Sequence, residues 1–90
     1  MFVETITSDR DEWEMLDRKL RMREDPPNGL VASVTWDIGD GKVTMLNVWD
    51  EPGHISDFNV ERAASAFAEV GQPTGKPKRH GEPIAVFIRP

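Results

Sequence analysis

The 90-residue chain has a formal net charge of −5, 38% hydrophobic residues and no cysteine. The acidic balance argues against general nucleic-acid binding, which needs a basic surface. The missing cysteines exclude disulfides, thiolate catalysis and zinc–thiolate or iron–sulfur sites. No apolar run approaches the ~20 residues that cross a bilayer, and the N-terminal residues lack a signal-peptide profile. We therefore expect one domain over residues 1–90, in the cytoplasm, with no nucleic-acid or membrane partner.

The N-terminal third predicts a strand followed by an amphipathic helix. Residues Phe2–Thr7 alternate and are rich in β-branched side chains, which favours a strand. Ser8 or Asp9 can cap the helix that follows. The apolar face of this helix is formed by Trp13, Leu16 and Leu20. The helix must end before the segment 25–29, because consecutive prolines remove backbone donors and favour extended geometry.

Two further strands, Leu30–Asp37 and Lys42–Trp49, flank a glycine-containing turn at residues 38–41 and predict an antiparallel hairpin. We expect Trp36 to lie opposite Val43. In that register one face of the hairpin carries Leu30, Ala32, Val34, Trp36, Val43, Met45, Asn47 and Trp49. The other face carries Val31, Ser33, Thr35, Thr44, Leu46 and Val48.

A second helix and a last strand complete the chain. The segment Asp50–Pro52 opens the helix, because acidic residues and a proline suit its first turn, and Gly71 ends it. Its buried side is predicted to hold Ile55, Phe58, Ala63, Ala66, Phe67 and Val70. The turn-rich segment Gln72–Pro83 is predicted to be a loop, and Ile84–Ile88 the last strand.

The resulting order, βαββαβ, predicts an α+β, ferredoxin-like fold with a four-stranded antiparallel sheet. Right-handed crossovers place both helices on one face of that sheet. The face without helices would expose Val31, Leu46 and Val48, with Val3 or Phe87 beside them. Covering apolar surface is favourable by roughly 25 cal/mol per Å². We therefore expect a homodimer that pairs its sheet faces, which is a dimeric α+β barrel.

Two short motifs carry a family resemblance: Pro-Asn-Gly-Leu-Val at residues 27–31 and Asn-Val-Trp-Asp-Glu at residues 47–51, with Ile55 and Phe58 following. With these motifs the chain resembles the dimeric α+β barrel superfamily, and within it the small antibiotic-biosynthesis-monooxygenase-like proteins, many of which have no assigned function. The resemblance implies a pocket between the helices and the sheet. Relatives with an activity include cofactor-free oxygenases of aromatic polyketides and haem-degrading oxygenases.

The same resemblance separates these two activities. The haem-degrading pattern has a histidine where this chain has Asn59 and an asparagine in the first strand, where this chain offers Glu4, Thr5 and Thr7. Haem degradation is therefore disfavoured. The polyketide-oxygenase pattern is matched in part, by Asn47 and Trp49.

Two further positions of the resemblance bear on acid–base chemistry. Uncharacterised relatives often carry a histidine in the second strand and another in the last strand. Ser33 and Ala85 stand at these positions, so two acid–base groups are missing here.

Each candidate residue has a structural and a functional interpretation. Trp49 either stacks against a planar ligand or fills the core. The buried amide of Asn47 needs partners, from a ligand or water in a cavity or from backbone. His54, in the first turn of the second helix, is either a base whose pKa the helix dipole lowers or an exposed residue. Glu4 is a buried carboxylate if it shares the inner face with Phe2 and Ile6, and otherwise is exposed.

These observations predict a ligand pocket with no cofactor and no metal. We expect it to be lined by Trp13, Trp36, Met45 and Phe58 and to take a small aromatic or polyketide-like ligand. As an enzyme the protein would be a cofactor-independent monooxygenase or isomerase, in which Asn47 and Trp49 orient the substrate and His54 acts as the base. The alternatives are a non-catalytic ligand-binding or interaction module, and a core filled by the tryptophans.

Overall fold

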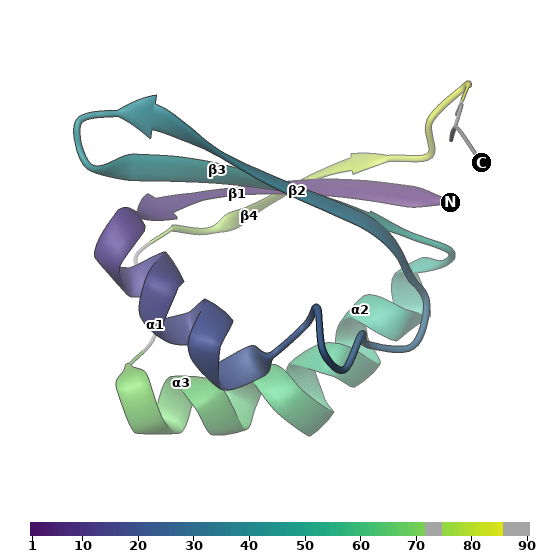
Figure 1. The fold of residues 1–90 in the computed structure, drawn as a ribbon. Coiled ribbons are helices and arrows are strands. Elements are labelled where there is room, and N and C mark those ends of the chain that lie inside the picture. Colours follow the sequence, from purple (N-terminus) through teal and green to yellow (C-terminus); the bar gives the residue numbers. More distant parts are fainter. Residues whose placement is uncertain (72–74, 86–90) are drawn as a thin grey trace.

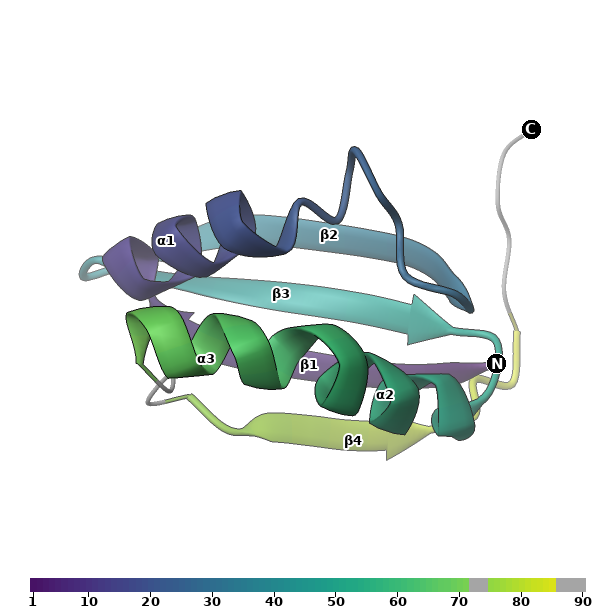
Figure 2. The same cartoon turned by 90° about the horizontal axis from the view of Figure 1, so that it is seen from below.

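A computed structural model, which describes residues 1–71 and 75–85, contains a four-stranded antiparallel sheet with helices over one face (Figures 1 and 2). The elements are β1 (Phe2–Asp9), α1 (Arg10–Leu20), β2 (Leu30–Gly39), β3 (Lys42–Trp49), α2 (Pro52–Phe58), the π-helical turn η1 (Asn59–Ala63), α3 (Ala64–Val70) and β4 (Pro77–Gly81). The strand order is β2-β3-β1-β4. This arrangement confirms the α+β, ferredoxin-like fold class.

Local sequence sets the ends of α1. Asp9 occupies the N-cap position, and Asp11 and Glu12 place negative charge in the first turn, where the helix dipole favours it. At the other end Arg21 adopts a left-handed conformation (φ 50°), and its N–H donates to the Asp17 carbonyl. The helix therefore ends well before the two prolines, as predicted.

The second helical segment runs from Pro52 to Val70 without a break but changes its pitch in the middle. Pro52 lies in the first turn, and the N–H of Gly71 (φ 92°) donates to the Phe67 carbonyl at 2.8 Å, as expected of a helix end. Between α2 and α3, η1 forms a π turn, which adds a residue to the turn. Asn59 and Ala63, at the two ends of this turn, both face the cavity between the helices and the sheet.

The predicted faces of β2 are wrong beyond its first residue. Leu30 pairs with Trp49 as expected, but the register shifts between Leu30 and Ala32, and from there Trp36 pairs with Thr44. An extra residue in one strand reverses the alternation of every residue that follows. Ala32, Val34 and Trp36 therefore lie on the sheet face without helices, which we call the open face.

The last strand also differs from the prediction. Residues Pro77–Gly81, expected to be a loop, form β4 and pair antiparallel with β1. Ile84 and Ala85 are not in a strand, and the rest of the predicted strand Ile84–Ile88 lies outside the described residues. A ladder of backbone hydrogen bonds along the free edge of β1 outweighs the weak β-propensity of this Pro- and Lys-containing segment.

Arg62 joins the helical layer to the end of α1. Its guanidinium donates to the carbonyl oxygen of Leu20 and, at 2.7 Å, to that of Asp25. The same group lies 5.7 Å from the centroid of the Phe58 ring. Because a planar fork of donors serves both carbonyls, this side chain fixes the spacing between α1 and the second helical segment.

Gly29 is the tightest point of the connection into β2. Its φ is +84°, and a Cβ there would overlap the His54 ring and the Asp50 carboxylate. We expect Gly29→Ala to destabilise the fold by about 2 kcal/mol or more, from left-handed strain together with overpacking. Urea unfolding measures the change.

Gly53 provides the matched control, because it lies inside α2 and a Cβ there meets nothing within 4 Å. We expect Gly53→Ala to be neutral or stabilising, by up to about 1 kcal/mol. Equal effects of the two substitutions would contradict the close approach at Gly29.

Candidate functional site

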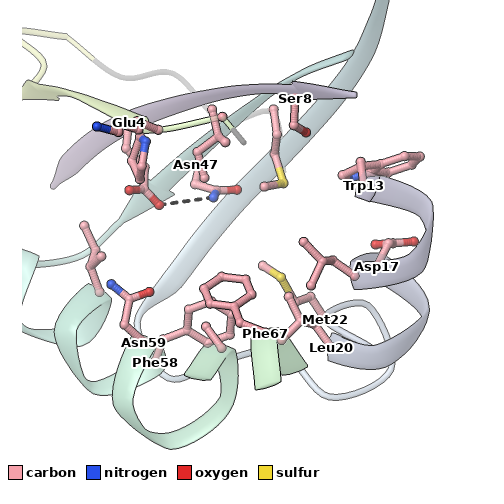
Figure 3. A pocket seen from close by; sticks show the side chains of 18 of the residues that line it. Glu4, Ser8, Trp13, Asp17, Leu20, Met22, Asn47, Phe58, Asn59 and Phe67 are labelled. Carbon is pink, nitrogen blue, oxygen red and sulfur yellow. Dashed lines mark hydrogen bonds between the residues drawn. The ribbon is translucent and has the colours of Figure 1, made fainter. Parts of the chain in front are cut away.

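A cavity of about 300 Å³ lies between the sheet and the helical layer (Figure 3). Its walls are mainly apolar and include Ile6, Trp13, Met45, Ile55, Phe58 and Phe67. Helices α1 and the α2–α3 segment supply one side, and β1, β3 and the residues around β4 supply the other. The inner faces of strands and helices thus enclose space instead of packing against each other completely.

A cluster of hydrogen-bonded polar side chains lies at one end of this cavity. Glu4 Oε1 accepts from Asn47 Nδ2 at 3.2 Å and from Trp49 Nε1 at 3.0 Å. The Oδ1 atom of Asn47 accepts from the Ser33 hydroxyl at 2.7 Å. We call these four residues the polar cluster. Glu4, Asn47 and Trp49 are at most 4% exposed, so the two bonds to Glu4 form away from bulk water and each is worth more than it would be at the surface. Ser33 is exposed, and its bond to Asn47 is only partly buried.

Strand register brings the polar cluster together. Glu4 in β1 pairs with Asn47 in β3, and Asn47 pairs with Ser33 in β2. Directly paired residues share a sheet face, so these three side chains form one row on the inner face. Trp49 lies two residues after Asn47 on that same face, from which its indole N–H reaches Glu4.

The second carboxylate oxygen of Glu4 is available to a ligand. Both hydrogen bonds of this side chain end on Oε1. Among the residues that the structure describes, no side-chain oxygen or nitrogen is both fully buried and without a partner, and Glu4 lines the cavity. Oε2 therefore keeps some access to the space around it and accepts no hydrogen bond from the described residues. Figure 3 shows the Glu4 carboxylate at the cavity wall, with one oxygen joined to Asn47.

The structure brings most of the predicted pocket residues together. Trp13, Met45 and Phe58 line the cavity, and Asn47 reaches it from the polar cluster. The amide of Asn47 bonds to the side chains of Ser33 and Glu4, and not to backbone as one of the two interpretations expected. Trp36 does not line the cavity: it lies on the open face and is 43% exposed, because of the register shift in β2.

Trp49 is placed behind the cavity wall instead of in it. Its side chain is fully buried, and its ring lies 5.7 Å from that of Phe58, centroid to centroid. A ligand in the cavity would not stack on the indole. The function that this geometry gives Trp49 is to hold the Glu4 carboxylate through its N–H.

His54 lies outside the cavity lining, at the connection between β3 and α2. Its Nδ1 is 2.5 Å from Asp50 Oδ1, and its Nε2 is 3.9 Å from Glu51. The hydrogen bond to Asp50 raises the pKa of His54, and the nearby charges of Asp50, Glu51 and Asp57 add to the effect. The expected lowering of this pKa by the helix dipole is therefore wrong, because the carboxylate partners outweigh it.

Glu4, Lys76 and Arg79 line the cavity but are not among the predicted site residues. The sequence allows Glu4 to lie on either face of the first strand, and its pairing with Asn47 places it on the inner face. Lys76 and Arg79 line the cavity from a segment expected to be a loop. The described part of the chain contains no group of three or more His, Asp or Glu side chains arranged to hold a metal ion.

Comparisons with solved structures give the fold and no more. A protein of unknown function from Nitrosomonas europaea superposes with a TM-score of 0.72 at 9% identity, over 99% of this chain and 94% of that one. A protein from Deinococcus radiodurans, provisionally named an antibiotic biosynthesis monooxygenase, gives 0.63 at 15% identity over all of both chains. A dimeric ferredoxin-like protein from an uncultured marine organism gives 0.63 at 16%, over 99% and 100%.

The resemblance to monooxygenase-like and dimeric ferredoxin-like proteins is thus confirmed at the level of the fold. No protein-family model matches the chain, and no curated protein matches its sequence. Among the described residues no helix is long and apolar enough to cross a membrane. Cytoplasmic residence stays a prediction.

The His54–Asp50 pair makes stability depend on pH. A raised His54 pKa means that its contribution is complete below the ordinary value of about 6.5 and is lost as pH rises through the folded value. The Asp50 pKa is lowered, chiefly by the hydrogen bond from His54, so its contribution is lost only as pH falls below about 4. The pair therefore stabilises the fold most between roughly pH 4 and 6.5.

We expect His54→Gln to reduce the free energy of unfolding more at about pH 5.5 than at about pH 9. Chemical unfolding at the two pH values measures this difference. Asp50→Asn should show the same pattern, and the double variant should lose little more than either single one, because both remove one interaction. A pH-independent loss, or full additivity, would contradict the pairing.

Proposed function

We propose that this cavity binds a small aromatic or polyketide-like molecule through apolar contacts and one hydrogen bond to Glu4. The observation that supports this best is the free Oε2 atom of a carboxylate that is 4% exposed and faces an apolar cavity of about 300 Å³. Ligand sites are typically apolar pockets with a few placed polar groups. A hydroxyl or an acidic C–H of a flat molecule is the complement of this arrangement.

The chemistry that suits the site is oxygenation without a cofactor, and Glu4 takes the role of base that sequence reasoning gave to His54. Its carboxylate removes a proton from an activated CH₂ group between aromatic rings, as a general base. The resulting anion transfers one electron to O₂, and the carbon radical and superoxide combine to a peroxide anion. This anion takes the proton back from the Glu4 carboxyl group and becomes a hydroperoxide. Loss of water then leaves a ketone. Overall, CH₂ and O₂ become C=O and H₂O.

Asn47 and Trp49 are positioning residues in this mechanism. Their N–H groups hold Oε1 and leave Oε2 directed at the substrate. Two donors that converge on one oxygen, at 3.2 and 3.0 Å, restrict the rotation of the carboxylate. The provisional name of the Deinococcus radiodurans protein is consistent with such an activity.

Anthrone, a flat tricyclic molecule with one activated CH₂, is a suitable test substrate. We expect the protein to consume one O₂ for each anthraquinone formed, and Glu4→Gln to lower kcat by about 100-fold or more through loss of the base. Oxygen uptake measures the reactant consumed, and anthraquinone absorbance measures the product formed. His54→Gln is the matched control and should leave the rate unchanged, because His54 does not line the cavity.

A non-catalytic ligand-binding module is the second candidate, favoured by the placement of His54 outside the cavity. In that case anthrone would bind without oxygen uptake above the spontaneous rate. Asn47→Ala and Trp49→Phe should weaken binding under both candidates, because each removes a donor that holds Glu4. A chain that neither binds nor oxidises anthrone contradicts the proposed function.

We also propose that the protein forms a homodimer through the open face of its sheet. The open face carries Val3, Ala32, Val34, Trp36, Leu46 and Val48. Val34 is 55% exposed and Trp36 43%, and large apolar side chains gathered on one surface favour association. The dimeric state of the ferredoxin-like neighbour is consistent with this.

A charge on the open face tests the dimer. We expect Val34→Lys to shift the protein from dimer to monomer, because a buried ammonium group in the interface has no partner. Val60→Lys is the matched control, since Val60 is 78% exposed on the helical layer and takes the same change of charge. Sedimentation at micromolar concentration distinguishes the outcomes. A monomeric parent protein would contradict the proposal.

A further inference from the structure

We propose that the ligand of this cavity carries an anionic substituent, of the carboxylate class, that Lys76 and Arg79 bind on the β4 side. The inference rests on the proposed function, because it concerns the same cavity. It follows from the charges around the cavity and from which of them have partners.

Most basic side chains of α1 and the neighbouring strands and loop already have an acidic partner. Ion pairs of 2.9–3.2 Å are formed by Arg10, Lys19, Arg23 and Lys42. Lys76 and Arg79 form none with the residues that the structure describes, although the chain has more acidic than basic residues. Both side chains are exposed and both line the cavity, so an entering ligand can reach them.

The charges that line the cavity leave one positive charge uncompensated once the ion pair of Asp17 with Arg23, which lies outside the lining, is counted. Four of its side chains are charged: Glu4, Asp17, Lys76 and Arg79. The Asp17 carboxylate is 2.9 Å from Arg23 and is thereby neutralised. Two cations and one carboxylate remain, and the carboxylate is held by two neutral donors. A ligand with one negative charge balances the lining, whereas a cationic ligand would add to the excess.

The backbone places the two cations firmly. Arg79 pairs with Glu4 across β1 and β4, so both side chains belong to the inner face. Gly75 directly precedes Lys76, and a Cβ at Gly75 would overlap the carbonyl oxygen of Thr7. The chain can approach β1 this closely only with glycine, and that approach brings Lys76 to the cavity wall.

This geometry also indicates where the anion lies on the ligand. Paired residues of neighbouring strands have Cβ atoms about 5 Å apart. Glu4 and Arg79 therefore start from neighbouring positions on the inner face, and a ligand with a hydroxyl and a carboxylate close together can contact both. The guanidinium fork suits a carboxylate, and a carboxylate that leaves water for an apolar cavity needs such a partner.

A matched pair of compounds tests the inference: 3-hydroxy-2-naphthoate and 2-naphthol, which differ only in the carboxylate. We expect calorimetric titration to show the naphthoate binding about tenfold or more tightly than the naphthol, as a charge-assisted pair implies. In the variant Lys76→Gln/Arg79→Gln that preference should disappear while naphthol binds as before, which also shows that the variant is folded.

Lys78→Gln is the control for the loss of positive charge. Lys78 pairs with Thr5 on the open face and does not line the cavity, so this variant should keep the full preference for the naphthoate. Equal affinities in the unmodified protein, or a preference that survives in Lys76→Gln/Arg79→Gln, would overturn the inference and leave the proposed function standing. If neither compound binds at millimolar concentration, both fail.

Discussion

The arrangement of the inner face depends on the burial of one carboxylate. Removing Glu4 from water costs several kcal/mol unless its charge is satisfied. The N–H groups of Asn47 and Trp49 satisfy one oxygen, and both come from β3. A shift of one residue between β1 and β3 would turn Glu4 outward and leave both donors without it. These hydrogen bonds therefore fix the register of β1 against β3, and side chains of both strands line the cavity.

The extra residue in β2 connects the two faces of the sheet. Had the alternation continued from Leu30, Trp36 would lie on the inner face, where a large ring could occupy much of the space that is now cavity. The register shift after Leu30 sends Trp36 and Val34 to the open face instead. One local irregularity thus leaves a cavity on the inner face and adds apolar side chains to the open face. The two features on which the proposed ligand binding and the proposed dimer rest are in this sense results of the same strand geometry.

Sequence patterns were sufficient for the elements whose signals are local. The proline at the start of α2 and Gly71 at the end of α3 follow from the chemistry of helix ends, and β1 and β3 follow from alternation. Asp9 is at the N-cap position of α1 as expected, but its side chain makes no capping hydrogen bond. The face of Trp36 could not be predicted, because a bulge has no mark in the letters around Val31. The position of β4 was missed for a related reason. An edge strand is selected by the strand it pairs with, and Lys78 and Arg79 have little intrinsic preference for a sheet.

Those misplacements affected the chemistry more than the fold. If Pro77–Gly81 were a loop, nothing would place Arg79 near Glu4, and the sequence then predicts His54 as the base. The pairing of β4 with β1 changes this assignment, because it places Arg79 next to the buried Glu4 at the edge of the apolar cavity. His54 is committed instead to Asp50, where it stabilises the turn into α2. The buried carboxylate that lines the cavity therefore comes from the sheet, where hydrogen bonds from β3 hold it, and the helices contribute apolar wall. Under the proposed function this carboxylate, and not His54, is the base.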